Sequence, residues 1–358
     1  MLRVVIRRSR DITYLRDDRG EEIEGVREGP APWWIRGAGD LGRPDDVARV
    51  LSTTERSSVV GYDLIMAAPR PISILVALAP EHASAVVVAH RRAVAGALGY
   101  LEERAIVVRD RRGGEEHDLA GRWSHVVGFT HGVNRHGEPH LHDHVLVGAR
   151  PAGARVVLDS RALYAHGAAA DALYRGTLRA EVARTTPFVP WRSFEGVEHV
   201  EGLDEGYRVL WGGHHPDRGT KRHWSREDVR DAWARDVTRF EPHGVRRPPQ
   251  ARVDELNEHA FAAAFEGRDL VARRHIVAAW ANAATFGADA ASVSASVDHW
   301  YPELSDSRGV REGLIGVGAA RMIEVTRERG ARPLHVEDLE RWRQRSRERS
   351  RDGVERSR

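Results

Sequence analysis

The chain has 358 residues, 41% of them hydrophobic, which is enough to bury a core in one large domain or in two smaller ones. It contains no cysteine, and this excludes disulfide bonds, thiol catalysis and thiolate-bound metals. The formal net charge is +2, and nearly all of the positive charges are arginine rather than lysine. Abundant arginine suits phosphate recognition, but it would also follow from a genome that prefers arginine codons.

Hydrophobic periodicity predicts alternating strands and helices up to residue 184. Strands are expected at 3–6 and 62–67, with a short helix at 45–51 between them. A second apolar run at 72–78 precedes a long alanine-rich helix at 80–103 and a strand at 106–109. Residues 123–131 and 142–147 are predicted to pair as antiparallel strands, and residues 168–184 are predicted to form a helix that buries Leu173, Leu178 and Val182. This mixture predicts an α+β fold, an antiparallel sheet with flanking helices, rather than a parallel doubly wound sheet.

The second half of the chain has a different composition. It becomes polar from residue 212, and a proline-rich stretch at 246–250 is the best linker candidate. We therefore expect a first domain at 1–245, a linker at 246–252, a helical domain at 253–342 and a disordered tail of arginine, serine and glutamate at 343–358.

The sequence lacks the signatures of two protein classes, namely secreted or membrane-spanning proteins and P-loop ATPases. The N-terminal apolar run is too short for a signal peptide and no stretch is long enough to span a membrane, so we expect a soluble cytoplasmic protein. A Walker A loop needs a lysine between glycine and a hydroxyl residue, whereas the only lysine, Lys221, lies between Thr220 and Arg222. An ATPase or helicase of the P-loop type is therefore not expected.

Histidines gather in one short stretch of the sequence. Seven of the nineteen lie between His117 and His144. Side chains two residues apart on a strand share a face, so His140, His142 and His144 would project together, and His131 at the end of the preceding strand could close on them. Three imidazoles on one face suit a divalent metal. The spacing alone leaves open whether His140 with His142 or His142 with His144 is the ligand pair.

Several segments in the same order resemble the conjugative relaxases of the MobF (TrwC/TraI-like) family, which belong to the HUH endonucleases. The resemblance covers roughly residues 30–185, and its strongest element is Gly61-Tyr-Asp-Leu-Ile-Met-Ala-Ala-Pro-Arg-Pro-Ile-Ser. Further matches are Trp34-Ile-Arg-Gly37, Ala89-His-Arg-Arg-Ala-Val94, Phe129-Thr-His131 followed after ten residues by His142-Asp-His144, and Leu158-Asp-Ser-Arg161. The resemblance implies that His131, His142 and His144 are the metal ligands and that His140 is a neighbouring or solvated residue.

The resemblance also implies a reaction. Relaxases of this family cut one DNA strand by attack of a tyrosine hydroxyl on a phosphate, which leaves a 5′-phosphotyrosine and a free 3′-hydroxyl without ATP. The bound cation is expected to be Mg²⁺ or Mn²⁺, with Zn²⁺ as the alternative. Asp63 would orient a histidine such as His144 or accept a proton. The family places its nucleophile near the N-terminus, where Tyr14 is the one tyrosine before Tyr62, so Tyr14 is the expected nucleophile.

DNA contacts and partners are less closely defined. Arg70 and the group Lys221, Arg222 and Trp224 are candidates to grip single-stranded DNA by charge and stacking. Expected partners are origin-of-transfer DNA, relaxosome accessory proteins, a coupling protein and a separate helicase, with no membrane. Two other functions stay open: a rolling-circle replication initiator, and a DNA-binding accessory protein that has the relaxase fold but does not nick.

A glycine pattern at Gly37, Gly39 and Gly42, with Asp63 about twenty residues later, also fits a dinucleotide-binding loop. Pro44 follows the third glycine, and no convincing βαβ unit surrounds the pattern. The relaxase resemblance accounts for the same glycines, and we favour it.

Overall fold

The structure is a computed structural model that describes residues 2–12, 15, 33–36, 50–54, 57–112, 115–193, 195–211, 226–238, 263–264, 268, 270–300 and 314–316. Several predictions fall outside these residues. They concern Tyr14, Lys221, Arg222, Trp224, the linker at 246–252, the tail at 343–358 and most of the short helix at 45–51.

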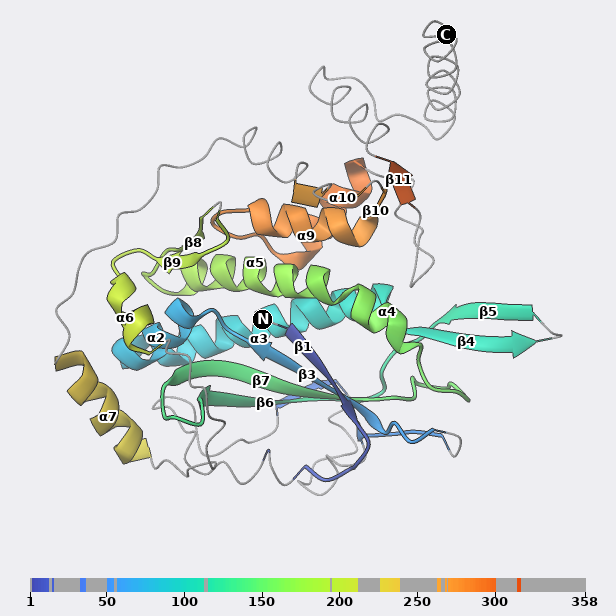
Figure 1. Cartoon of the computed structure of the whole chain (residues 1–358), viewed down its shortest axis with the longest axis horizontal. Coiled ribbons are helices and arrows are strands. Elements are labelled where there is room, and N and C mark those ends of the chain that lie inside the picture. The colour runs from blue at the N-terminus through green and yellow to red at the C-terminus, as the bar shows by residue number, and fades with distance from the viewer. Residues whose placement is uncertain are drawn as a thin grey trace, which may run out of the picture.

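A five-stranded antiparallel sheet lies along the lower side of the molecule in Figure 1. Its strands are β1 (Leu2–Arg7), β2 (Trp33–Arg36), β3 (Gly61–Ala67), β6 (Val126–Val133) and β7 (Pro139–Gly148), in the order β1-β3-β7-β6-β2. Every neighbouring pair is antiparallel, which confirms the predicted sheet and the predicted pairing of the two histidine-bearing strands. β7 begins earlier than predicted, because the ladder extends to the pair Val133 and Pro139.

Three helices cover one face of this sheet: α2 (Arg70–Leu78), α3 (Pro80–Arg104) and α5 (Gly167–Thr185). The apolar run at 72–78 forms α2, whose first turn accommodates Pro71 since the early amide groups of a helix have no internal partner. The long helix predicted at 80–103 is confirmed as α3. The helix predicted at 168–184 is confirmed as α5, and Leu173, Leu178 and Val182 are all fully buried.

Residues after the expected linker also pack on this helical layer. α9 (Arg273–Ala283) lies along α5, and α10 (Ala290–Trp300) contacts α3, α5 and α9. Arg179 of α5 is 1% exposed and donates to the carbonyl oxygens of Ala281 and Ala284, which ties the C-terminal end of α9 to α5. β10 (Leu270–Ala272) and β11 (Leu314–Gly316) form a short antiparallel pair that the sequence did not predict. The division into separate domains stays a prediction.

Smaller elements surround the two layers. β4 (Val107–Arg112) and β5 (Glu115–Ala120) form a hairpin that projects from the body at the right of Figure 1. The remaining elements are α4 (Ser160–Ala165), β8 (Pro190–Arg192), β9 (Glu198–Val200), α6 (Glu205–Leu210) and α7 (Arg226–Thr238). α7 is joined to the turn between β6 and β7, because Trp233 donates its indole N–H to the carbonyl oxygen of Gly137 at 2.7 Å. None of the helices in the described ranges is both long and apolar enough to cross a membrane.

The apolar interior has two parts, one on each face of the sheet. The larger part fills the space between the sheet and α2, α3, α5, α9 and α10. The smaller part lies on the opposite face and consists of Ile12, Leu15, Val50, Leu51, Val127, Phe129 and Leu146. The N-terminal segment therefore packs on the face that the helices leave uncovered.

The first residue of β3 shows how closely this second core is packed. A Cβ added to Gly61 would lie 2.3 Å from the carbonyl oxygen of Val147 and 2.6 Å from Leu51, and the Val147 oxygen belongs to backbone that cannot give way easily. Gly61→Ala is therefore expected to lower the stability by about 1–3 kcal/mol, as overpacking does. Gly99→Ala is the control, since nothing lies within 4 Å of a Cβ there and alanine favours the helix. Denaturant unfolding of both variants checks this, and equal stabilities would contradict the packing.

Candidate metal centre

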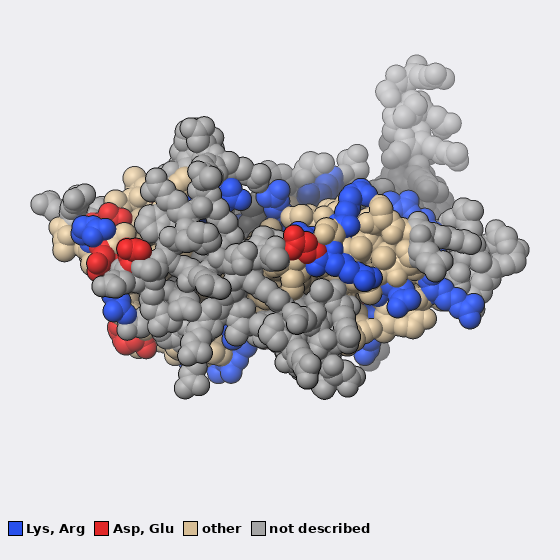
Figure 2. Space-filling view, turned by 90° about the horizontal axis from the view of Figure 1, so that it is seen from below, with Lys and Arg blue, Asp and Glu red and all other residues tan. Residues whose placement is uncertain are grey.

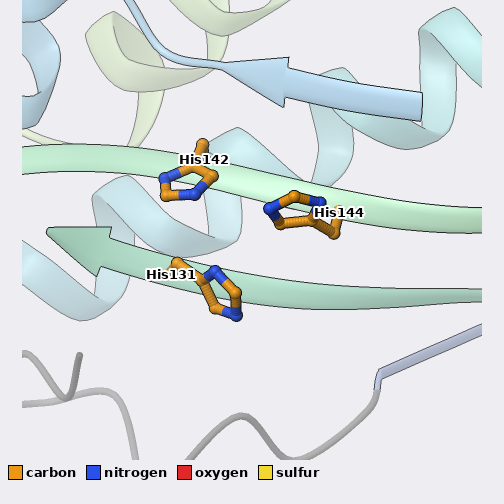
Figure 3. Close-up of side chains that lie close together, drawn as sticks. All are labelled: His131, His142 and His144. Carbon is orange, nitrogen blue, oxygen red and sulfur yellow. The ribbon is translucent and has the colours of Figure 1, made fainter. Parts of the chain in front are cut away.

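Three histidine side chains converge on the face of the sheet opposite α3 and α5. His131 comes from β6 and faces its register partner His142 on β7, while His144 lies two residues further along β7. Because side chains alternate along a strand, His142 and His144 share a face, and Figure 3 shows all three rings turned toward one another. One nitrogen from each lies within 4.8 Å of the other two.

The histidines are packed rather than free in solvent. His131 is 2% exposed, and the ring centroids of the three are 5.1–5.4 Å apart. Among the described residues this is the one group of three or more metal-binding side chains that the structure assembles. The group is the set that the family resemblance selected from the four histidines nominated by strand geometry.

The hydrogen bonds of two rings leave a nitrogen available for a metal. His144 directs Nδ1 at Asp63, 2.9 Å from Oδ2 and 3.1 Å from Oδ1, and His142 directs Nδ1 at the carbonyl oxygen of His140 at 2.8 Å. Both partners are acceptors, so each ring carries its proton on Nδ1 and has an Nε2 lone pair for a cation. Metal-ligating histidines commonly use this tautomer, and the nitrogen donor set fits a borderline divalent ion such as Zn²⁺ or Cu²⁺.

The surroundings also favour the neutral form of His142, which is the form that binds metals. Burial lowers the pKa of His142 well below its usual value, and the neighbouring histidines His140, His131 and His144 lower it further. Burial and the adjacent Arg70 lower the pKa of His140 to about 4. A pocket that disfavours a proton on its imidazoles is suited to an ion that takes the proton's place.

Asp63 is placed by β3, which pairs with β7 on the side away from β6. It is 2% exposed, and both of its oxygens lie within hydrogen-bonding distance of the His144 ring. This arrangement corresponds to the orienting role expected for Asp63. The alternative role, acceptance of a proton from a reacting group, stays a prediction.

His140 lies on the same strand face, but it is not part of the group of three. Its ring centroid is 4.7 Å from that of His142, and its carbonyl oxygen accepts the His142 proton. His140 therefore supports a ligand through its backbone, which the sequence could not indicate.

Arg70, a candidate for DNA contact, is engaged inside the protein. Its Nη1 donates to the carbonyl oxygen of Pro139 at 2.8 Å and lies 3.7 Å from Glu138. Burial is the main cause that lowers the pKa of Arg70, and Glu138 opposes this change. These contacts hold the turn that precedes the histidines on β7. Tyr14 and the group Lys221, Arg222 and Trp224 are outside the described residues.

The N-terminal segment reaches the histidine-bearing face through two apolar side chains. Ile12 is 6% and Leu15 is 0% exposed, and both belong to one apolar cluster with Phe129 and Leu146. Phe129 precedes His131 by two residues and Leu146 follows His144 by two, so these side chains share the face of the candidate ligands. Ile12 and Leu15 therefore pack next to the histidine-bearing parts of β6 and β7.

Comparison with known proteins identifies the family of the chain. The family model described as TrwC relaxase matches residues 19–211, which is more than half of the chain. A comparison with curated proteins gives no match.

The fold resembles solved structures of conjugative relaxase TrwC in complex with oriT DNA. The metal-bound complex has a TM-score of 0.54 at 18% identity, and the copper-bound complex has a TM-score of 0.54 at 19% identity. TrwC with a 27-mer DNA comprising the recognition hairpin and the cleavage site has a TM-score of 0.52 at 18% identity. Each of these three alignments covers 67% of this chain and 98% of the other. At such low identity the likeness shows the fold.

Proposed function

Because the chain belongs to the TrwC relaxase family, a group of MobF-type conjugative relaxases, we propose that it makes a site- and strand-specific nick at an origin of DNA transfer. The observation that carries this proposal is the convergence of His131, His142 and His144, two of which hold their Nδ1 protons on neighbouring acceptors. The expected substrate is single-stranded DNA at a transfer origin. Accessory proteins, a coupling protein and a separate helicase are the proposed further partners.

The three histidines would hold Mg²⁺ or Mn²⁺, with Zn²⁺ as the alternative. Solved TrwC complexes include a metal-bound and a copper-bound form, which supports a bound cation in this family. A divalent cation there would polarise a non-bridging oxygen of the scissile phosphate and offset the charge of the transition state.

Tyr14 is the proposed nucleophile. Ile12 lies two residues before Tyr14 and Leu15 directly after it in the sequence, and both are buried on the histidine-bearing face. In the proposed step the tyrosine oxygen loses its proton and bonds to phosphorus, the bond from phosphorus to the 3′ oxygen breaks, and that oxygen takes up a proton. The number of phosphoester bonds is unchanged, so the step is reversible without ATP. A single tyrosine can perform one nick and its reversal.

The electrostatics of the surface support an anionic partner. Figure 2 views the molecule from below, where the sheet lies in Figure 1, and arginine predominates over carboxylates among the described residues in its right-hand half. A pocket near the ends of β6 and β7 is lined by Ser52, Ser124, His125 and Arg150, and no acidic side chain lines it. Such a surface attracts a phosphate backbone by charge.

Asp63 is proposed to fix the tautomer and orientation of His144. Asp63→Asn keeps the size of the side chain but removes the charge that receives the His144 proton, so the affinity for Mn²⁺ is expected to fall by about tenfold to a hundredfold. Calorimetric titration with Mn²⁺ measures this. Asp289→Asn is the matched control, because it removes an exposed carboxylate at the start of α10 where asparagine also caps well. Equal affinities in the two variants would refute this role for Asp63.

The nicking proposal is tested with a random pool of single-stranded oligonucleotides, Mn²⁺ and the full chain. A 5′-phosphotyrosine intermediate retains a label at the 3′ end of the DNA on the denatured protein and releases a label at the 5′ end. Retention of the 3′ label alone is the expected result. DNA binding without any denaturant-stable adduct would instead indicate an accessory protein that has kept the relaxase fold.

We retain the proposed division of the chain into a relaxase domain at 1–245, a linker at 246–252, a helical domain at 253–342 and a tail. The packing of α9 on α5 would place the helical domain directly on the helical layer of the relaxase domain. We draw no functional conclusion for the helical domain.

A further inference from the structure

The residues next to the candidate ligands form a buried polar network on the reverse face of the sheet. Thr130 precedes His131, and Asp143 lies between His142 and His144. The two are register partners on β6 and β7. Because their side chains alternate with those of the ligands, they point to the opposite side, toward the helices. Asp143 is 0% exposed.

Asp143 is linked to two helices through His90. His90 of α3, also 0% exposed, lies with Nε2 3.1 Å from Asp143 Oδ1 and with Nδ1 2.8 Å from the hydroxyl of Tyr174 on α5. Tyr174 is fully buried. The chain of contacts therefore runs from α5 through α3 to the strand that carries two of the candidate ligands.

A second arm of the network reaches β6. Arg91 donates from both Nε and Nη2 to Thr130 Oγ1, each at 3.2 Å, and Thr130 in turn hydrogen-bonds to Asp143. His90, Thr130 and Arg91 thus all face Asp143 from α3 and β6. Burial raises the pKa of Tyr174 well above its ordinary value, so its hydroxyl keeps the proton. With its ring proton on Nε2, which lies 3.1 Å from Asp143 Oδ1, His90 accepts a hydrogen bond at Nδ1 from the Tyr174 hydroxyl.

Packing does not explain a carboxylate at this place. The flanking residues on the same side of β7, Leu141 and Val145, are apolar and buried. A buried carboxylate is unfavourable unless it is paired and hydrogen-bonded, whereas an aliphatic side chain would fill such a site without that requirement. The carboxylate instead links β7 to α3 and α5 through polar contacts of fixed direction. It does so at the residue that lies between His142 and His144.

We propose that Asp143, His90 and Tyr174 are positioning residues that fix β7 and β6 so that His131, His142 and His144 keep the geometry required by a divalent cation. This inference rests on the proposed function of those histidines as metal ligands. The network touches no ligand side chain. It would act through the backbone of residues 130–131 and 142–144, whose rotation or sliding would turn the imidazoles apart.

The test uses two similar tyrosine substitutions in the full chain. Tyr174→Phe removes the hydroxyl that donates to His90. Tyr100→Phe is the matched control, because Tyr100 is also buried and its hydroxyl makes a 2.8 Å hydrogen bond to Nδ1 of a buried histidine, His166, which lies between α4 and α5. Each variant loses one hydrogen bond of the same kind, so their stabilities should fall by similar amounts. Asp143→Asn, which keeps the volume and removes the charge, is the stronger variant.

The readouts are the affinity for Cu²⁺ as the probe ion and the electron paramagnetic resonance spectrum of bound Cu²⁺, which reports the geometry of its nitrogen ligands. The expected result is a spectrum that changes in Tyr174→Phe and Asp143→Asn but not in Tyr100→Phe, with an affinity about tenfold lower in Asp143→Asn. If Asp143→Asn does not fold, Tyr174→Phe against Tyr100→Phe decides.

Two outcomes overturn the inference and are distinguishable. Spectra of Tyr174→Phe and Asp143→Asn that match the unaltered chain would show that the network only stabilises the fold, and would leave the metal centre intact. An unaltered chain that binds no Cu²⁺ through its histidines would remove the metal centre itself, and the inference with it.

Discussion

Replacing His131, His142 and His144 together by alanine is expected to abolish cation binding and to slow DNA cleavage by about a thousandfold, which corresponds to about 4 kcal/mol of lost transition-state stabilisation. The three rings form the one group of three or more potential metal ligands that the described residues assemble. Without them no cation would offset the charge that develops on the phosphate oxygens. The rate of adduct formation with single-stranded DNA and Mn²⁺ measures the effect.

The control for this variant replaces three histidines elsewhere in the chain by alanine. His82 packs edge-on against Phe188, His199 stacks on Trp191, and His136 lies exposed in the turn between β6 and β7. That control should keep its cation affinity and most of its cleavage rate. An adduct that forms at the unaltered rate in the first triple variant would show that the histidines do not serve the reaction.

Tyr14→Phe is expected to remove the covalent adduct altogether while cation affinity and DNA binding stay within about twofold, because phenylalanine keeps the ring and loses only the attacking oxygen. The position matters because a hydroxyl with an ordinary pKa of about 10 reacts only when it lies beside a charged centre or a base. Adduct yield after denaturation is the measurement.

Tyr164→Phe is the control for the nucleophile. Tyr164 lies on α4 with 47% of its surface exposed, so it is accessible to DNA but sits away from the histidines in the sheet. Its loss should leave the adduct unchanged. Persistence of the adduct in Tyr14→Phe, together with its loss in another tyrosine variant, would reassign the nucleophile.

Local patterns predicted those parts of the site that depend on strand alternation. The spacing of His140, His142 and His144 placed three side chains on one face, and the antiparallel ladder sets His131 opposite His142. The family motif around Asp63 singled out a carboxylate that contacts His144 in the structure, although the two residues lie 81 positions apart in the chain. These features could be read because each depends on a short segment with a fixed period.

Features that depend on tertiary packing could not be read in the same way. His90 lies in a helix with no periodic sign that it faces Asp143, and a buried aspartate between two histidines looks like a solvated residue in the sequence. The packing of α9 on α5 depends on Arg179, whose burial against backbone carbonyl oxygens contradicts the usual exposure of arginine. Such contacts join elements that are more than fifty residues apart in the chain, and no local pattern encodes them.

Mapping the covalent adduct tests the central claim most directly. The denatured complex of the full chain with single-stranded DNA is digested with nuclease and trypsin, and the peptide that carries a phosphonucleotide is identified by mass spectrometry. Cleavage after Arg10 and Arg16 releases Asp11-Ile-Thr-Tyr-Leu-Arg16, in which Tyr14 is the one tyrosine. The expected result is a 5′-phosphonucleotide on this peptide, formed with Mn²⁺ and absent from the variant that lacks His131, His142 and His144. A chain that binds the DNA with Mn²⁺ present and carries no phosphonucleotide on any tyrosine would contradict it.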